Sequence, residues 1–112
     1  EETIKLCKIL KENGVEVMDV STGGGVSHQE IEIKKNYQVP FASAIKNEVG
    51  CITGAVGLIF ESNQAEEILQ NNQADLIFVA REILRNPYLP VRGSFKNKDH
   101  CFFPPQYERA KP

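Results

Sequence analysis

The chain has 112 residues, of which 41% are hydrophobic and 25% are charged, and its 13 Lys and Arg against 15 Asp and Glu leave a net charge of -2. This length is enough for one domain and not two, and the composition is ordinary for a globular protein. The charge excludes a protein that holds nucleic acid or an anionic membrane by bulk charge, and no apolar run approaches the roughly 20 residues that a membrane-spanning helix needs. We therefore expect a soluble, cytoplasmic protein with no nucleic-acid or membrane partner.

The first helix and strand follow from the N-terminal pattern. The apolar and small residues that recur at helical spacing on one face are Thr3, Leu6, Cys7 and Leu10. Gly14 lies where this helix can end. Residues 15–21, VEVMDVS, then read as a strand that closes on a Thr-Gly-Gly-Gly run. A polar loop is predicted from Val26 to about Val39.

A second helix and strand come next. Pro40 suits the first position of a helix whose buried stripe contains Phe41, Ala44, Ile45 and Val49, and Gly50 follows where it should stop. Residues 51–56, CITGAV, are predicted to form a short strand.

A third helix is indicated by Asn63 with Glu66 three residues later, which is the spacing of a capping box. Its apolar face contains Ala65, Ile68 and Leu69, and the Asn-Asn-Gln run at 71–73 ends it. The run 75–80, DLIFVA, is continuously apolar after its first residue and predicts a strand buried on both faces. A fourth helix is predicted over 81–85, before Asn86 and Pro87.

Helices that alternate with strands predict an α/β fold with parallel strands joined by right-handed crossovers. Three such strands alone would expose two unpaired edges, and a (β/α)₈ barrel needs roughly 250 residues, so this chain could supply only part of one. Met18 is the only methionine, so Glu1 is not a translation start. We expect the chain to be part of something larger. Its last 25 or so residues form a tail interrupted by prolines, whose Phe102 and Phe103 could dock on another surface.

Two neighbouring strand ends carry the most informative residues. In parallel α/β folds, ligands lie beyond the carboxyl ends of the strands. Gly57 follows the second strand, and Ala80 and Arg81 follow the third and open a helix. Backbone amides at a helix start bind phosphate, and an Arg adds charge-assisted hydrogen bonds. The alternative is that Gly54 and Gly57 serve packing while Arg81 caps a surface helix; the combination favours phosphate binding slightly.

Elsewhere the structural interpretation is favoured over a catalytic one. The glycines at 23–25 are typical of a flexible turn, and His28 and His100 lie in loops with no nucleophile pattern nearby. Asp19 and Asp75 lie in or beside strands and could be buried and paired. The cysteines, Cys7, Cys51 and Cys101, are widely spaced; they form neither a disulfide framework nor, with two histidines, a zinc site. We expect three reduced thiols, two of them buried, and no metal.

Several ordered motifs resemble the Old Yellow Enzyme family, and they cover nearly the whole chain, most weakly from Val91 to Phe103. The similar segments are DVSTGG at 19–24, YQVPFA at 37–42, TGAVGLI at 53–59, AEEILQ at 65–70, ADLIFVARE at 74–82, LRNPY at 84–88 and QYER at 106–109. The last of these is similar to the C-terminal signature of the bacterial, thermophilic-like branch of NADPH dehydrogenases.

The resemblance implies a TIM barrel that carries FMN, with NADPH as hydride donor and an activated alkene such as an enone or maleimide as substrate. It places residues 1–89 in the C-terminal βα units of the barrel, about strands six to eight, and residues 90–112 in a tail that reaches a neighbouring subunit. The positions that match the FMN phosphate site are Gly57, Ala80 and Arg81, with Ala80 where the family commonly has Gly.

The same resemblance implies a homo-oligomer in which Arg109 reaches a neighbouring subunit's active site and Arg85 lies near the shared boundary. The substrate-anchoring pair of the family (His-His or His-Asn) and its proton-donating tyrosine lie earlier in the barrel, so no catalytic residue is expected in this segment. The segment is expected to be inactive alone and to work with the rest of its own barrel.

Two other interpretations stay open. A standalone phosphate- or nucleotide-binding α/β module could bury its strand edges by oligomerisation. A different phosphate-binding barrel enzyme, such as an isomerase or aldolase, could share the half-barrel pattern, although the ending from Gln106 to Arg109 argues against it.

Overall fold

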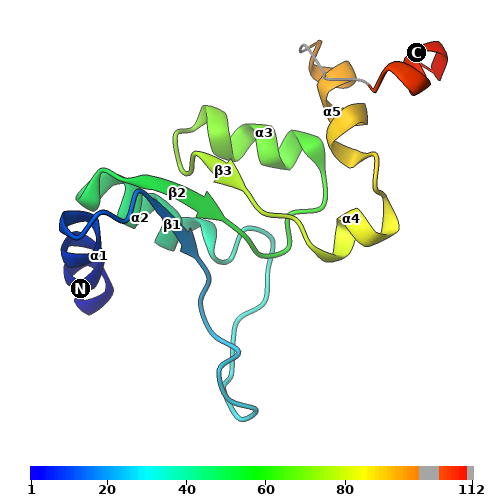
Figure 1. Ribbon diagram of the computed structural model, residues 1–112. Helices are drawn as coiled ribbons and strands as arrows, with labels where there is room; N and C mark the ends of the chain where they lie inside the picture. Colours follow the sequence, from blue (N-terminus) through cyan, green and yellow to red (C-terminus); the bar gives the residue numbers. More distant parts are fainter. Residues whose placement is uncertain (99–103, 111–112) are drawn as a thin grey trace.

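The computed structural model describes residues 1–98 and 104–110, in which helices and parallel strands alternate before a helical C-terminal part (Figure 1). The predicted α/β alternation is confirmed. In chain order the elements are α1 (Glu2–Glu12), β1 (Val17–Val20), α2 (Val39–Val49), β2 (Ile52–Ala55), α3 (Ser62–Gln70), β3 (Leu76–Ile77), α4 (Arg81–Arg85), α5 (Leu89–Asn97) and the 3₁₀ helix η1 (Pro105–Ala110).

Glycine and proline set the ends of the first two helices, close to where the sequence predicts them. Gly14 follows the end of α1 with φ of 92°, and Gly50 ends α2 with φ of 69°. These positive φ values suit glycine because it has no Cβ. Pro40 lies in the first turn of α2, where its missing N–H costs no helical hydrogen bond.

The three strands form one parallel sheet in the order β1-β2-β3. Val17 pairs with Ile52 and Val20 with Ala55, while β3 joins through Gly54–Leu76 and Ala55–Ile77. All three carboxyl ends therefore lie at one edge of the sheet, as a parallel arrangement requires. The loops that leave that edge begin at residues 21, 56 and 78.

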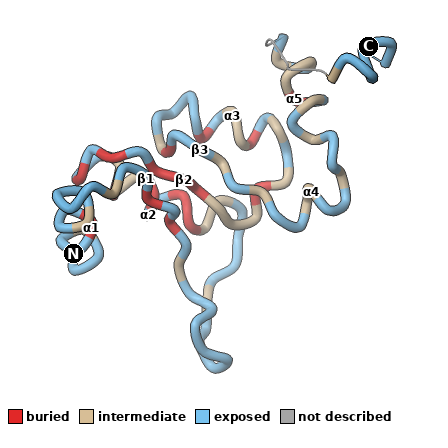
Figure 2. The backbone as a smooth tube through the Cα atoms, viewed as in Figure 1, coloured by how far each residue is buried: buried red, intermediate tan, exposed pale blue. Residues whose placement is uncertain are grey.

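The core lies on one face of the sheet, between the strands and helices α1, α2 and α3 (Figure 2). Side chains from all three helices meet the inward residues of β1 and β2: Cys7, Val39, Ala42, Ile45, Val49 and Ile68 against Met18, Val20 and Ala55. Cys7 and Cys51 are free and buried, as predicted, while Cys101 lies outside the described residues. Burial raises the pKa of the Cys7 thiol, and the nearby Cys51 adds to this.

The opposite face of the sheet is not covered by any described helix. Val17, Ile52, Leu76 and Phe78 are exposed there. The prediction that residues 75–80 form a strand buried on both faces is therefore wrong. Only Leu76 and Ile77 pair as β3, because this edge strand has one neighbour and one covered face.

Two further predictions differ from the structure. Asn63 is not a cap: α3 begins at Ser62, Glu61 precedes it, and no side chain caps its first turn. The sequence also shows no helix in the tail, whereas α5 occupies Leu89–Asn97. Gly93 explains how α5 packs on α3, since a Cβ there would lie 2.6 Å from Cβ of Ser62.

Polar side chains join the amino end of β3 to β2 and α2. Lys46 Nζ lies 2.8 Å from Asp75 Oδ1, and the Thr53 N–H donates to Asp75 Oδ2 over 2.9 Å. The hydrogen bond from Lys46, followed by that from the Thr53 amide, lowers the pKa of Asp75. Asp75 is thus paired, as the sequence suggested, while Thr53 Oγ1 is buried without a hydrogen-bond partner among the described residues.

The described chain is elongated. Its radius of gyration is 16.3 Å, whereas a compact domain of this length has about 13 Å. The loop between β1 and α2 and the C-terminal helices extend away from the sheet (Figure 1). None of the described helices has the length and apolar character needed to cross a membrane.

Candidate functional site

The two segments predicted to bind phosphate leave the sheet side by side. β2 ends at Ala55 and β3 at Ile77, and the Phe78 N–H donates to the Ala55 carbonyl over 2.8 Å. Gly57 lies two residues beyond β2, and Arg81 four residues beyond β3. The expectation that these positions follow neighbouring strand ends is confirmed.

Arg81 begins α4 and is exposed. Within residues 1–98 and 104–110 it forms no ion pair, whereas the next residue, Glu82, lies 2.9 Å from the guanidinium of Arg85. Because the first amides of a helix have no partner inside it, donors from the backbone of α4 accompany the Arg81 side chain. A guanidinium with backbone amides is a donor set suited to a phosphate.

Ala80 precedes α4 with φ of −104°. Because φ is negative, the position does not need the positive φ that glycine adopts readily, and ψ is −80°.

Gly57 is required by the surrounding structure. Its φ is 106°, and a Cβ would lie 2.6 Å from Nε2 of Gln38 and 2.7 Å from the ring of Tyr37. Gly54 is similarly constrained, since a Cβ there would lie 1.9 Å from the ring of Phe78. Packing thus accounts for both glycines, as the alternative interpretation held, and leaves the backbone amide of Gly57 as its possible functional group.

Two buried glutamines, which sequence reasoning missed, connect the loops at this edge. Gln38 accepts a hydrogen bond from the Thr22 N–H in the loop after β1. Gln64, on α3, accepts from the Phe60 N–H and donates to the Leu58 carbonyl and to Asn36 Oδ1. Gln38 lies in the predicted loop and gave no signal, and the only signal for Gln64 was its place four residues before the apolar Ile68 on the predicted helix.

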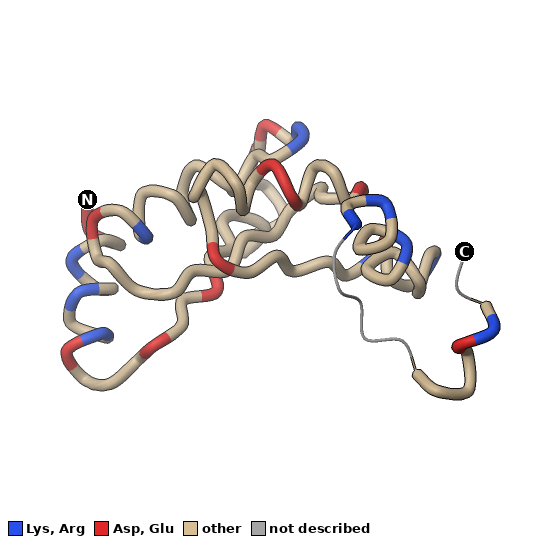
Figure 3. Tube along the Cα trace, turned by 90° about the horizontal axis from the view of Figure 1, so that it is seen from above, with Lys and Arg blue, Asp and Glu red and all other residues tan. Residues whose placement is uncertain are grey.

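The segment that follows β3 carries a positive net charge. Residues 81–98 contain five cationic side chains and Glu82 as the only acidic one, in a chain whose net charge is -2, and Figure 3 shows Lys and Arg gathered around α4 and α5. Such a local excess of cations attracts anionic groups. The cations are Arg81, Arg85, Arg92, Lys96 and Lys98.

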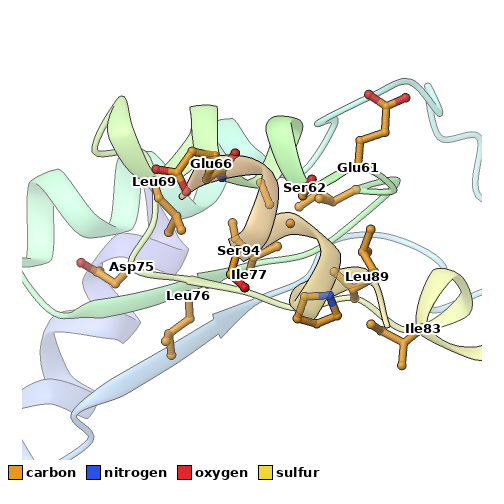
Figure 4. A pocket seen from close by; sticks show the side chains of 16 residues that line it. Glu61, Ser62, Glu66, Leu69, Asp75, Leu76, Ile77, Ile83, Leu89 and Ser94 are labelled. Carbon is orange, nitrogen blue, oxygen red and sulfur yellow. The ribbon is translucent and has the colours of Figure 1, made fainter. Parts of the chain in front are cut away.

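A groove of about 390 Å³ lies between α3, β3 and α5 (Figure 4). Its walls are largely apolar, with Ile77, Ile83 and Leu89 among them, and Glu61 and Glu66 are its charged residues together with Asp75. No Lys or Arg lines it, and neither Gly57 nor Arg81 belongs to it. The groove is therefore poorly suited to a phosphate and is separate from the candidate site.

The remaining candidates do not join a catalytic cluster in the described part of the chain. His28 lies exposed in the loop after β1, Asp19 is exposed on the open sheet face, and Cys51 begins the amino end of β2. Arg109 is exposed in η1. His100, Phe102 and Phe103 lie outside the described residues. Across 1–98 and 104–110, no group of three or more His, Cys, Asp or Glu is arranged to hold a metal ion.

Comparison with known proteins gives a consistent result. Residues 1–99 match the NADH:flavin oxidoreductase / NADH oxidase family. The chain is 50% identical over 107 residues to an NADPH dehydrogenase of Halalkalibacterium halodurans. It is 46% and 47% identical over 110 residues to NADPH dehydrogenases of Geobacillus thermodenitrificans and Listeria innocua.

These matches cover 96% or 98% of this chain but only 31% or 32% of each relative. The chain therefore spans about a third of the length of the relatives that it matches. The resemblance to the Old Yellow Enzyme family that the motifs carry is confirmed. The chain belongs to the NADH:flavin oxidoreductase / NADH oxidase family.

Proposed function

We propose that this chain is the segment of an FMN-dependent NADPH dehydrogenase of the Old Yellow Enzyme type that holds the FMN phosphate. The observation that carries the proposal is the position of Gly57 and Arg81 beyond adjacent parallel strands, with the Arg81 guanidinium unpaired within residues 1–98 and 104–110. In a (β/α)₈ barrel, the loops after the last two strands commonly form a phosphate site.

The open face of the sheet supports membership in a barrel. Val17, Ile52 and Leu76 present apolar side chains that no described helix covers. The inner face of a barrel strand carries such branched apolar side chains, because they fill the barrel interior once the other strands are present. We infer that this chain contributes three strands, about the sixth to the eighth, to such a barrel.

The residues present fit a phosphate group. The Arg81 guanidinium supplies a planar fork of charged donors, and the amides of Gly57 and Ala80 supply neutral donors from two loops. Ala80 keeps a backbone N–H for this fit, and its φ of −104° is not one that requires glycine. The surrounding cations of α4 and α5 add a favourable field.

Gly57, Ala80 and Arg81 would hold the phosphate of FMN, and the bound cofactor would supply hydride-transfer chemistry between NADPH and an activated alkene. The share of this segment is to bind and orient the phosphate end of the cofactor. We propose no catalytic residue in it; His28, exposed in the loop after β1, is not assigned one.

The C-terminal residues are proposed to act across a homo-oligomer. Arg109 is exposed in η1 and Arg85 is held by Glu82 at the end of α4. We expect Arg109 to contact the substrate or flavin of a neighbouring subunit, with Arg85 near the boundary. In the full-length protein, Arg109→Ala should change turnover or the substrate KM with FMN content retained. Unchanged kinetics would remove Arg109 from the site.

Arg81→Ala tests the phosphate assignment. In the full-length protein it should weaken FMN binding by about 1.5–3 kcal/mol, because a charged hydrogen bond is lost. The control is Lys5→Ala, which removes an exposed cation of α1, outside the segment that contains the candidate site. FMN titration measures both variants; full FMN affinity in Arg81→Ala would refute the assignment.

A second function is favoured by the same open sheet face, which a standalone phosphate-binding module could bury by oligomerisation. The visible absorbance spectrum after gel filtration with FMN distinguishes the two proposals. We expect only the full-length protein to retain the flavin band. Retention by the 112-residue chain alone would instead support a compact flavin-binding module.

A further inference from the structure

Gln64 has every polar side-chain atom engaged. The residue is 6% exposed and lies in the first turn of α3. Its Oε1 accepts from the Phe60 N–H over 3.1 Å, and its Nε2 donates to the Leu58 carbonyl over 2.9 Å and to Asn36 Oδ1 over 2.6 Å. Because one backbone partner is a donor and the other an acceptor, only one orientation of the carboxamide satisfies both.

The turn that Gln64 holds has an unfavourable backbone. Gly57 has φ of 106° and Leu58 has φ of 53°, so two consecutive residues lie at positive φ. Leucine rarely adopts such a conformation, because its Cβ approaches the following carbonyl. A conformation of this kind persists only where surrounding contacts hold it in place, and such positions are common at binding sites. The two bonds from Gln64 to Leu58 and Phe60 supply those contacts.

The turn is also held from the segment that precedes α2. Asn36, itself at φ of 60°, bonds to Gln64, and two residues later Gln38 packs against Gly57. Gln38 is 3% exposed and accepts the Thr22 N–H. Two buried, neutral carboxamides therefore connect the loops after β1 and β2.

We propose that Gln64 is a positioning residue that keeps the Gly57–Leu58 turn in the conformation that binds the FMN phosphate. The proposal rests on the function proposed above. It follows from the three bonds of Gln64 and from the positive φ of both residues in the turn. Gln64 acts through the turn, so its loss should weaken binding of the phosphate and leave binding of the flavin ring unchanged.

The test compares the affinity of the full-length apoprotein for FMN with its affinity for riboflavin, which lacks the phosphate. Gln64→Leu removes all three hydrogen bonds, while the leucine side chain fills a similar volume in the buried position. FMN affinity should fall about tenfold or more, as expected when an ordered polar contact is lost. Riboflavin affinity should change by less than about twofold, because on this proposal the turn binds the phosphate that riboflavin lacks.

Gln70→Leu is the matched control. Gln70 lies on the same helix but is exposed, and its Nε2 donates to Glu66. The affinity of the Gln70→Leu variant for FMN and for riboflavin should equal that of the wild type. Gln64→Glu keeps the shape and the acceptor for Phe60, and it provides a second measurement if the leucine variant does not fold. It should also lose FMN affinity selectively.

The outcomes separate the two proposals. An equal loss for FMN and riboflavin in the Gln64 variants, or no loss for either, overturns the positioning role. Arg81→Ala reports independently on the phosphate site: if its preference for FMN over riboflavin is unchanged, the proposed function fails whatever the Gln64 variants do. A selective loss in both Arg81→Ala and Gln64→Leu supports both.

Discussion

The two ends of the strands are held together by different chemistry. At the amino end, the ion pair between Lys46 and Asp75 joins α2 to β3. At the carboxyl end, the neutral side chains of Gln38 and Gln64 make the buried connections between the loops, and the Lys35–Glu61 pair there is exposed, with its charged atoms 3.8 Å apart. The Lys46–Asp75 ion pair is partly exposed, with side chains 15% and 34% accessible, whereas both glutamines are buried.

This difference suits an end that binds an anion. A buried carboxylate at the carboxyl end would compete with a phosphate for Arg81, whereas a carboxamide supplies hydrogen bonds without net charge. At the amino end no ligand competes, so charged pairs can serve stability alone. We infer that the loop connections at the carboxyl end depend little on pH, while those at the amino end weaken in acid.

Among the variants that test this comparison, Gly57→Ala should cause the largest loss in the free energy of unfolding. A Cβ would meet Gln38 at 2.6 Å in a backbone with φ of 106°, so we expect a loss of about 3 kcal/mol in the free energy of unfolding. Gly50→Ala is the matched control at the other end. It also has positive φ, but its nearest side-chain atom is 3.6 Å away, so about 1 kcal/mol is expected. Urea unfolding of the full-length protein measures both; equal losses would contradict the packing argument.

Asp75→Asn should have an intermediate effect that depends on pH. The pKa of Asp75 is lowered in the folded state, so its contribution is present above the unfolded-state pKa of about 4 and is lost as pH falls through the lower folded-state value. We expect a loss of about 1 kcal/mol near pH 7 that shrinks below about pH 4.

Urea unfolding at neutral and acid pH measures this effect. Glu32→Gln is the control, because Glu32 and Lys34 form a fully exposed surface pair, and it should change stability little at any pH. A constant difference for Asp75→Asn across this pH range would contradict the role of the ion pair.

Thr53→Val should give the smallest effect, and of opposite sign. The Thr53 side chain is fully buried; its Oγ1 lies beside Asp75 and helps to lower the pKa of that carboxyl, yet it meets hydrogen-bond geometry with none of the described residues. Removing an unsatisfied hydroxyl from a core position should stabilise the protein by about 0.5–1 kcal/mol. Thermal unfolding, with the exposed Thr3→Val as control, measures the gain. A clear loss of stability would mean that the hydroxyl is hydrogen-bonded.

Features set by neighbouring residues were predictable from the sequence. Pro40 and Gly50 mark α2 because proline and glycine constrain their own backbone, and the bounds of α4 follow from Arg81 and the Asn-Pro pair after Arg85. That Gly57 and Arg81 follow neighbouring strand ends was also predictable, since parallel strands have their carboxyl ends at one edge of the sheet.

Features that depend on distant partners were not predictable. Gln64 reads as a surface residue of an amphipathic helix, and its burial follows from Asn36, 28 residues earlier. Asn63 has the spacing of a cap, yet the helix already begins at Ser62. The exposure of Leu76 and Phe78 follows from what lies beside the sheet, which the apolar run itself does not specify.

The two buried cysteines make the opening of the core measurable by thiol chemistry. Cys7 belongs to α1 and to the same buried cluster as Cys51, and it also lines a cavity of about 650 Å³ between α1, β1 and α2. Its raised pKa keeps Cys7 a protonated, unreactive thiol at neutral pH. The rate at which Cys7 is alkylated therefore reports how often α1 moves enough to widen this cavity.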